Sequence, residues 1–142
     1  MPGNNRNPRP ASCCLPLPLP RDPSRKVLVL LARKMAIYGL RDASATMLAM
    51  QVFGSGFRRP LALLRCFMHE VATCSNRNIS VAPCCAPRMT RDEALLIDAL
   101  ATADLASLAA LTDNDDCGRA LTVALALREE IDVLERRMLS AR

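Results

Sequence analysis

The chain has 142 residues, seven cysteines, no tryptophan and a net charge of +5. This length suits a single domain with a core of its own. Hydrophobic residues make up 51% of the sequence but aromatic residues only 3%, and most of the hydrophobic residues are Ala and Leu. Because these two residues favour helices, whereas sheets favour β-branched and aromatic residues, the composition predicts an all-α fold and excludes an extensive sheet.

No segment of the sequence has the length of a membrane span. The longest apolar run, residues 27–32, ends at Arg33 and Lys34, well short of the ~20 residues that a span needs. The N-terminus is basic but lacks the apolar region of a secretory signal. We therefore expect a cytoplasmic protein with no membrane partner, whose cysteines are reduced thiols.

Charge is distributed unevenly along the chain. Residues 1–91 contain 14 Lys and Arg against 3 Asp and Glu, a net charge of +11, whereas residues 92–142 contain 5 against 11, a net charge of −6. The two halves should attract each other, because opposite charges interact favourably at short range. We expect Arg58, Arg59 or Arg88 to pair with carboxylates of the C-terminal half.

Residues 1–24 contain seven of the ten prolines, with an alternating Leu-Pro run at residues 15–20. Proline removes a backbone donor and disfavours both helices and sheet ladders. The segment is thus predicted to be a disordered, polyproline-like tail. The remaining residues, 25–142, are predicted to form one helical domain.

Three helices are expected before residue 75. Gly39 has the position of a C-terminal cap, Asp42 that of an N-cap and Pro60 that of a first-turn residue. Polar residues and two prolines then indicate a loop. These signals predict helices over residues 24–38, 43–53 and 60–74, and a loop over 75–89 with a short extended piece at 79–81.

The most specific local signal is a capping box at Thr90-Arg91-Asp92-Glu93. In this motif the Thr90 hydroxyl accepts from the backbone N–H of Glu93, and the Glu93 carboxylate accepts from that of Thr90. Asp104 has the position of a further N-cap, and residues 112–116 form a polar break. A last helix follows, with one apolar stripe: Ala120, Ala124, Leu127, Ile131, Leu134 and Met138. In all, the pattern predicts a single compact bundle of five or six helices.

Three blocks of sequence resemble a small bacterial family known as a domain of unknown function. They are GLRDA at residues 39–43, FGSGFRRPL at 53–61 and APCCAPRMT at 82–90. With the helices that connect them, they cover residues ~25–112. The resemblance implies no catalytic residues and marks these blocks as the places to look for function.

Cys84 and Cys85 are the first candidates for chemistry. They lie between two prolines, just before a predicted helix N-terminus and beside Arg88 and Arg91, where thiolates are stabilised. Three further metal-ligating residues share a broad face of the preceding helix: Cys66, His69 and Cys74. Together these residues could hold zinc, and the loop alone could act as a redox-active thiol site. The simpler interpretation, which we favour, is that these cysteines are small, buried packing residues.

No arrangement in the sequence is typical of an enzyme. His69 and Glu70 are adjacent on a helix and point apart. Gly54-Ser55-Gly56 followed by Arg58 and Arg59 could hold a phosphate, but a turn with internally paired arginines is favoured. A nucleic-acid interface in the basic N-terminal half remains an alternative, although the helix over residues 43–53 has no Arg, Lys or Asn to read bases. The sequence therefore favours a non-enzymatic helical binding or regulatory module with a protein partner and no cofactor.

Overall fold

A computed structural model describes residues 15–140 of the protein, and these residues form six α-helices. A 3₁₀ turn, η2 (Gly54–Gly56), and a small antiparallel sheet of β1 (Leu17–Pro18) and β2 (Arg88–Met89) complete the elements. The helices are α1 (Pro23–Tyr38), α2 (Ala43–Phe53), α3 (Arg58–Cys74), α4 (Arg91–Thr102), α5 (Leu105–Thr112) and α6 (Gly118–Ser140). The predicted all-α bundle is confirmed.

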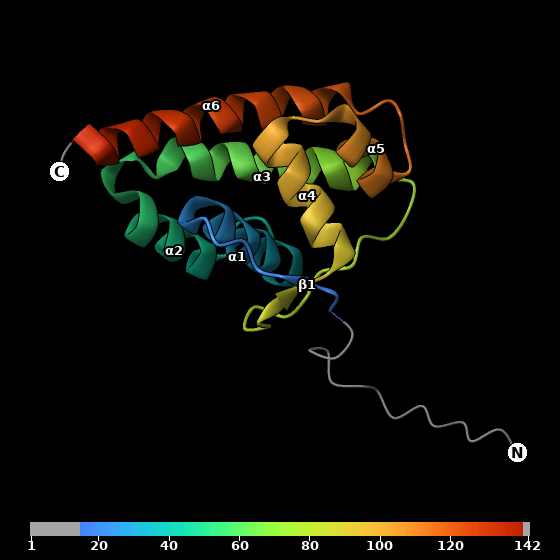
Figure 1. The fold of residues 1–142 in the computed structure, drawn as a ribbon, viewed down its shortest axis with the longest axis horizontal. Coiled ribbons are helices and arrows are strands. Elements are labelled where there is room, and N and C mark those ends of the chain that lie inside the picture. The colour runs from blue at the N-terminus through green and yellow to red at the C-terminus, as the bar shows by residue number, and fades with distance from the viewer. Residues whose placement is uncertain (1–14, 141–142) are drawn as a thin grey trace, which may run out of the picture.

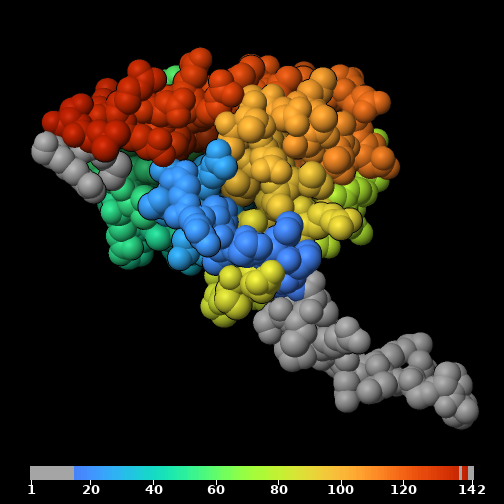
Figure 2. All heavy atoms as spheres, in the orientation of Figure 1, coloured from blue at the N-terminus to red at the C-terminus, as the bar shows by residue number. Residues whose placement is uncertain are grey.

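The two longest helices, α3 and α6, lie side by side and run in opposite directions (Figure 1). Helices α1 and α2 pack at one end of this pair, and α4 with α5 packs at the other. In the space-filling view the side chains of α1, α4 and α6 meet closely (Figure 2). The elements thus enclose one core, as expected for a single hydrophobic interior.

The core is built mainly from leucines on the inner faces of the helices. Leu31 of α1, Leu64 and Phe67 of α3, Leu108 of α5 and Leu127 of α6 are buried almost completely. The apolar stripe predicted for the last helix faces this core at five of its positions: Ala120, Ala124, Leu127, Ile131 and Leu134. Removing these stripes from water is the main force that holds helices of this length together.

The predicted helix ends are confirmed at four positions. The carboxylates of Asp42 and Asp104 accept from the backbone N–H groups of Ala45 and Ala106, both at 3.0 Å. Gly39 ends α1 with φ of 109°, a conformation that favours glycine. Both reciprocal hydrogen bonds of the capping box at Thr90 are present.

At the corner between α2 and α3 the backbone lies against the last helix. A Cβ atom at Gly56 would meet Leu134 Cδ2 at 3.0 Å. Glycine therefore allows this turn to approach α6 closely.

The tail was predicted to extend to residue 24, and this boundary is wrong, because residues 15–24 are part of the fold. Leu17 pairs with Met89 in the small sheet, and α1 already begins at Pro23 with Asp22 as its N-cap. Proline is tolerated here because the sheet has only two strands, so each strand is an edge. The tail predicted for residues 1–14 lies outside the described residues.

Two further boundaries differ from the predictions. Helix α3 begins at Arg58, two residues before Pro60, because proline fits the first turn as well as the first position. The extended piece predicted at residues 79–81 is not a strand, and the pairing occurs at Arg88–Met89 instead. The backbone of this loop forms hydrogen bonds with side chains of other elements, described below, rather than with a neighbouring strand.

Replacing Thr90 tests the capping box. Thr90 Oγ1 accepts from Glu93 N at 2.9 Å and donates to Ser80 O at 2.8 Å. We expect Thr90→Ala to lower the free energy of unfolding by about 1–2 kcal/mol, since it removes a cap and a loop contact. Thr90→Ser keeps both bonds and should change it little. Equal losses for the two variants in urea melts would show that the hydroxyl does not cap α4.

Candidate functional site

A fully buried arginine lies where α1, α4 and the loop before α4 meet. Arg33 has no exposed surface, and its guanidinium binds the carboxylate of Glu93 through both oxygens. Nε lies 2.6 Å from Oε2, and Nη2 lies 3.2 Å from Oε1. This two-point geometry is the strongest form of an Arg–carboxylate contact.

The other guanidinium donors of Arg33 bind the backbone of the loop. Nη1 donates to Ala86 O at 2.9 Å, and Nη2 also donates to Arg88 O at 2.8 Å. Glu93 Oε1 additionally accepts from Thr90 N at 2.9 Å. Because a buried charge is tolerated only when its polar atoms have partners, this network fixes the loop and both helices relative to one another.

A second pair of opposite charges holds the first part of the same loop. The guanidinium of Arg77 binds the carboxylate of Asp92, which also accepts from Ser80 N at 2.7 Å. Burial alone would raise the pKa of Asp92, but the hydrogen bonds from Arg77 and Ser80 outweigh it, so that the pKa lies below its ordinary value. The charged form of Asp92 is thus the form that the fold stabilises.

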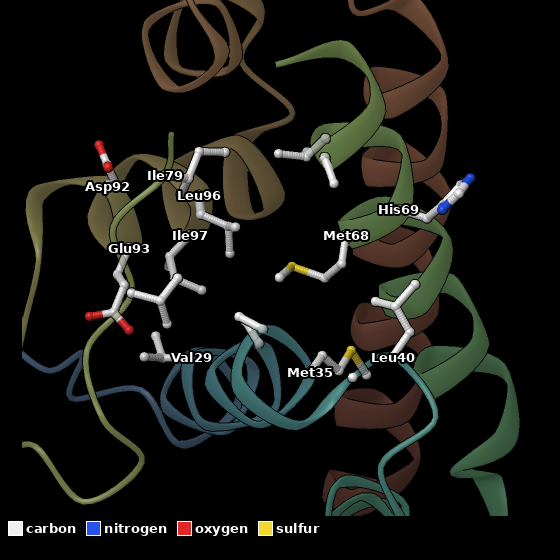
Figure 3. Close-up of a pocket in the computed structure, with 16 residues that line it drawn as sticks. Val29, Met35, Leu40, Met68, His69, Ile79, Asp92, Glu93, Leu96 and Ile97 are labelled. Carbon is white, nitrogen blue, oxygen red and sulfur yellow. The ribbon is translucent and has the colours of Figure 1, made fainter. Parts of the chain in front are cut away.

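The loop held in this way closes one side of an apolar cavity of about 370 Å³. Its inner walls come from α1, α3 and α4, and Ile79 and Val81 of the loop complete them. In Figure 3 the side chains of Met68 and Ile97 extend into the space between these helices. Ala36 of α1 and Ala72 of α3 are exposed wall residues, so the cavity opens to solvent beside them.

The polar side chains at the cavity do not point into it. Figure 3 shows the carboxylates of Asp92 and Glu93 directed away from the cavity, where Arg77 and Arg33 bind them. The imidazole of His69 also points away and is exposed. The interior therefore presents apolar side chains and two thioethers, those of Met35 and Met68.

The five predicted metal or thiol candidates do not form one site. Cys66 and Cys85 are exposed, and Cys74 and Cys84 are half-buried, so the prediction that these cysteines are buried packing residues is wrong for Cys66 and Cys85. Cys66 lies on an exposed face of α3, and Cys85 lies at the surface of the loop between α3 and α4. Within residues 15–140, no three His, Cys, Asp or Glu side chains are grouped so that they could hold a metal ion.

The three predicted arginines have different environments. Arg59 Nε lies 3.0 Å from Glu130 Oε2 of α6, which confirms a pair between the two halves of the chain. Arg58 instead lies over the ring of Phe57, 5.9 Å from its centroid. Arg88 has backbone partners instead, because its guanidinium donates to the backbone oxygens of Leu15 and Pro16. Those two residues directly precede β1, in a segment that we predicted to be part of the tail.

The sequence did not predict the Arg33 network or the cavity. One signal for the network was available: Arg33 follows Val29 by four residues, so it lies on an apolar stripe of α1 where a charge needs a partner. The sequence could not indicate the cavity, because its walls come from segments that are distant in the chain. A close approach of the Cys74 and Cys117 sulfurs was not predicted either.

A family model described as "Family of unknown function (DUF6628)" matches residues 9–141. The chain belongs to this family. The match confirms the resemblance to a domain of unknown function and extends it beyond residues 25–112 into the last helix. A search of curated proteins and a search of solved structures each found no match. Among the described residues, no helix is long and apolar enough to cross a membrane.

Removing the buried arginine should destabilise the fold strongly. We expect Arg33→Met to lower the free energy of unfolding by about 3–5 kcal/mol, since it leaves the Glu93 carboxylate buried without its partner. The double variant Arg33→Met, Glu93→Leu should recover much of this loss. Urea unfolding of the three proteins measures the effect, and a loss below about 1 kcal/mol for Arg33→Met would contradict the network's role.

The lowered pKa of Asp92 predicts a loss of stability in acid. A carboxyl group whose pKa is lower in the folded state contributes stability above its unfolded pKa of ~3.9, and this contribution is lost as the pH falls through the folded pKa. Thermal melts between pH 7 and pH 2 should therefore show a decrease at the acid end that is smaller in Asp92→Asn. The same decrease in both proteins would assign it to other carboxylates.

Proposed function

We propose that this protein is a non-enzymatic binding module whose cavity between α1, α3 and α4 binds a compact, uncharged and mostly apolar small molecule. The observation that carries the proposal is the apolar cavity of about 370 Å³. Ligand sites of folded proteins have volumes of ~300–1,000 Å³ and are lined mainly by apolar side chains. The cavity lies in this range, which suits a molecule of about one or two rings.

The charge distribution around the cavity supports an uncharged ligand. Both nearby carboxylates are occupied by arginines, and they point away from the interior. A charged ligand would lose its hydration on entering the cavity and would find no opposite charge there, which costs free energy. An apolar molecule gains roughly 25 cal/mol for each Å² of apolar surface that it removes from water.

The composition of the walls supports a site that can adapt to its ligand. Met35 and Met68 lie on opposite helices, and their flexible thioethers can adjust to the shape of a ligand. The ion pairs of Arg33 and Arg77 hold the loop that carries Ile79 and Val81. Part of the cavity is therefore fixed and part is adjustable, as expected for a site that is largely formed before binding.

The other functions considered from the sequence have less support. For nucleic acid, four arginines of the basic half are engaged within the molecule, since Arg33, Arg59 and Arg77 pair with carboxylates and Arg65 binds Leu40 O and Thr46 Oγ1. For zinc, no three His, Cys, Asp or Glu side chains within residues 15–140 are grouped to hold an ion. A protein partner remains the alternative occupant of the cavity through its apolar side chains. We propose no cofactor and retain the cytoplasm as the proposed location, which the free state of the five cysteines within residues 15–140 supports.

Binding of a neutral apolar dye tests the proposal. N-phenyl-1-naphthylamine fluoresces strongly in apolar surroundings, and titration of the full chain should show saturable binding at one site. Ala36→Phe or Ala72→Phe places a ring at the exposed edge of the cavity and should weaken the binding roughly tenfold or more. Because both alanines are exposed, these variants should keep their thermal stability within a few degrees.

Ala62→Phe provides a matched control, since Ala62 is an exposed residue of α3 that does not line the cavity. This variant should bind the dye as the unmodified protein does. If Ala36→Phe and Ala72→Phe bind the dye unchanged, the dye occupies another hollow and the proposal is wrong. If the dye does not bind at all, a protein partner becomes the better explanation of the cavity.

A further inference from the structure

Two cysteines far apart in the sequence meet at the ends of α3 and α6. Cys74 is the last residue of α3, and Cys117 directly precedes α6. Their sulfur atoms are 2.8 Å apart, only about 0.8 Å more than the length of a disulfide bond. Bond formation between them therefore needs little movement of the two sulfur atoms.

Hydrogen bonds around the two cysteines hold these chain segments in place. Asn114 Nδ2 donates to Cys74 O at 2.8 Å. In addition, Asn76 N donates to Thr112 O at 2.7 Å, and Asn76 Nδ2 donates to Asp113 O at 3.0 Å. Since these bonds join the end of α3 to the α5–α6 connection next to the thiols, the approach of the sulfurs is built into the fold.

The pair borders a surface hollow. Cys117 is 2% exposed and Cys74 is half-buried, and both line this hollow together with Glu70, Asp116 and Arg119. A small reagent in this hollow can reach the Cys74 sulfur first. The Cys117 sulfur lies 2.8 Å from it.

We propose that Cys74 and Cys117 form a reversible thiol–disulfide site that is oxidised by low-molecular-weight disulfides such as oxidised glutathione. In the first step the Cys74 thiol loses its proton, and its sulfur attacks one sulfur of the reagent. This step forms a mixed disulfide and releases one molecule of reduced thiol. The Cys117 sulfur then loses its proton and attacks the Cys74 sulfur, which forms the protein disulfide and releases the second reduced thiol.

The electron balance of this exchange is complete. The two protein thiols lose two electrons and two protons, and the reagent disulfide gains them to become two thiols. A reducing dithiol reverses the reaction by the same two steps. The site therefore needs no metal and no bound cofactor.

The chemistry of Cys74 sets the rate of the first step. Burial, together with the neighbouring Cys117 and Glu70, raises the pKa of Cys74 to about 12. Because the thiolate is the nucleophile, oxidation of Cys74 should be slow at neutral pH. Its rate should rise about tenfold with each pH unit until the pH reaches that pKa. Glu70 and Asp116 oppose the thiolate and Arg119 favours it, and all three lie at the hollow.

The disulfide would connect α3 to α6 across 43 residues. Closing a loop of this size restricts the unfolded chain strongly, so the oxidised form should melt roughly 10 °C above the reduced form. The inference is independent of the proposed ligand, since neither cysteine lines the cavity.

Peptide mapping of the full chain tests the site directly. In a Cys66→Ser background, the reduced protein is incubated with oxidised glutathione at pH 8.5, free thiols are blocked with N-ethylmaleimide, and the protein is digested with trypsin. Residues 66–77 and 92–119 are then separate tryptic peptides with one cysteine each. We expect these two peptides to be joined, with a mass two hydrogens below their sum, and to separate after treatment with dithiothreitol.

Two variants control the experiment. Cys117→Ala should abolish both the joined peptide and the rise in melting temperature on oxidation, whereas Cys85→Ser, which changes an exposed cysteine, should keep both. Melting of Cys117→Ala in the reduced state shows whether it is folded. Glutathione adducts on Cys74 or Cys85 in the folded protein, without the joined peptide, would overturn the proposal.

Discussion

The ion pair between Arg33 and Glu93 is the contact on which the rest of this structure depends. A guanidinium with no exposed surface requires a carboxylate and further acceptors, and these come from α4 and from the backbone of the loop before it. The same carboxylate completes the capping box of α4. One interaction thus sets the position of α1 against α4, the start of α4 and the path of the loop, and with them one side of the cavity.

Three pairs of opposite charges connect the two halves of the chain and help to assemble the fold. Arg33, Arg59 and Arg77 from the basic half pair with Glu93, Glu130 and Asp92 from the acidic half. The Arg33–Glu93 pair is shielded from water and the Arg77–Asp92 pair is partly so, while Arg59 is largely exposed and its pair contributes little. Because these cations are engaged within the molecule, the basic N-terminal half is a weaker argument for nucleic acid than its net charge suggests.

Helix α3 connects the two features that we interpret functionally. Met68 and Ala72 line the cavity, and Cys74 ends the helix beside Cys117. The cavity and the thiol pair involve different residues at this end of α3. The cavity suits an uncharged apolar ligand, whereas the thiol pair suits thiol–disulfide exchange. In a family of unknown function, these two sites give separate points at which function can be tested.

Local sequence signals determined the helices and their caps. The apolar stripe of residues 120–134, the N-caps at Asp42 and Asp104 and the capping box at Thr90 depend on neighbours within one or two turns, so the sequence suffices to predict them. Only the tertiary structure decided the partner of Arg33, the pairing of Leu17 with Met89, the cavity and the approach of Cys74 to Cys117. The three pairings join residues at least 43 positions apart, and the cavity combines four separate segments of the chain, so these contacts depend on how the whole bundle packs rather than on any local pattern.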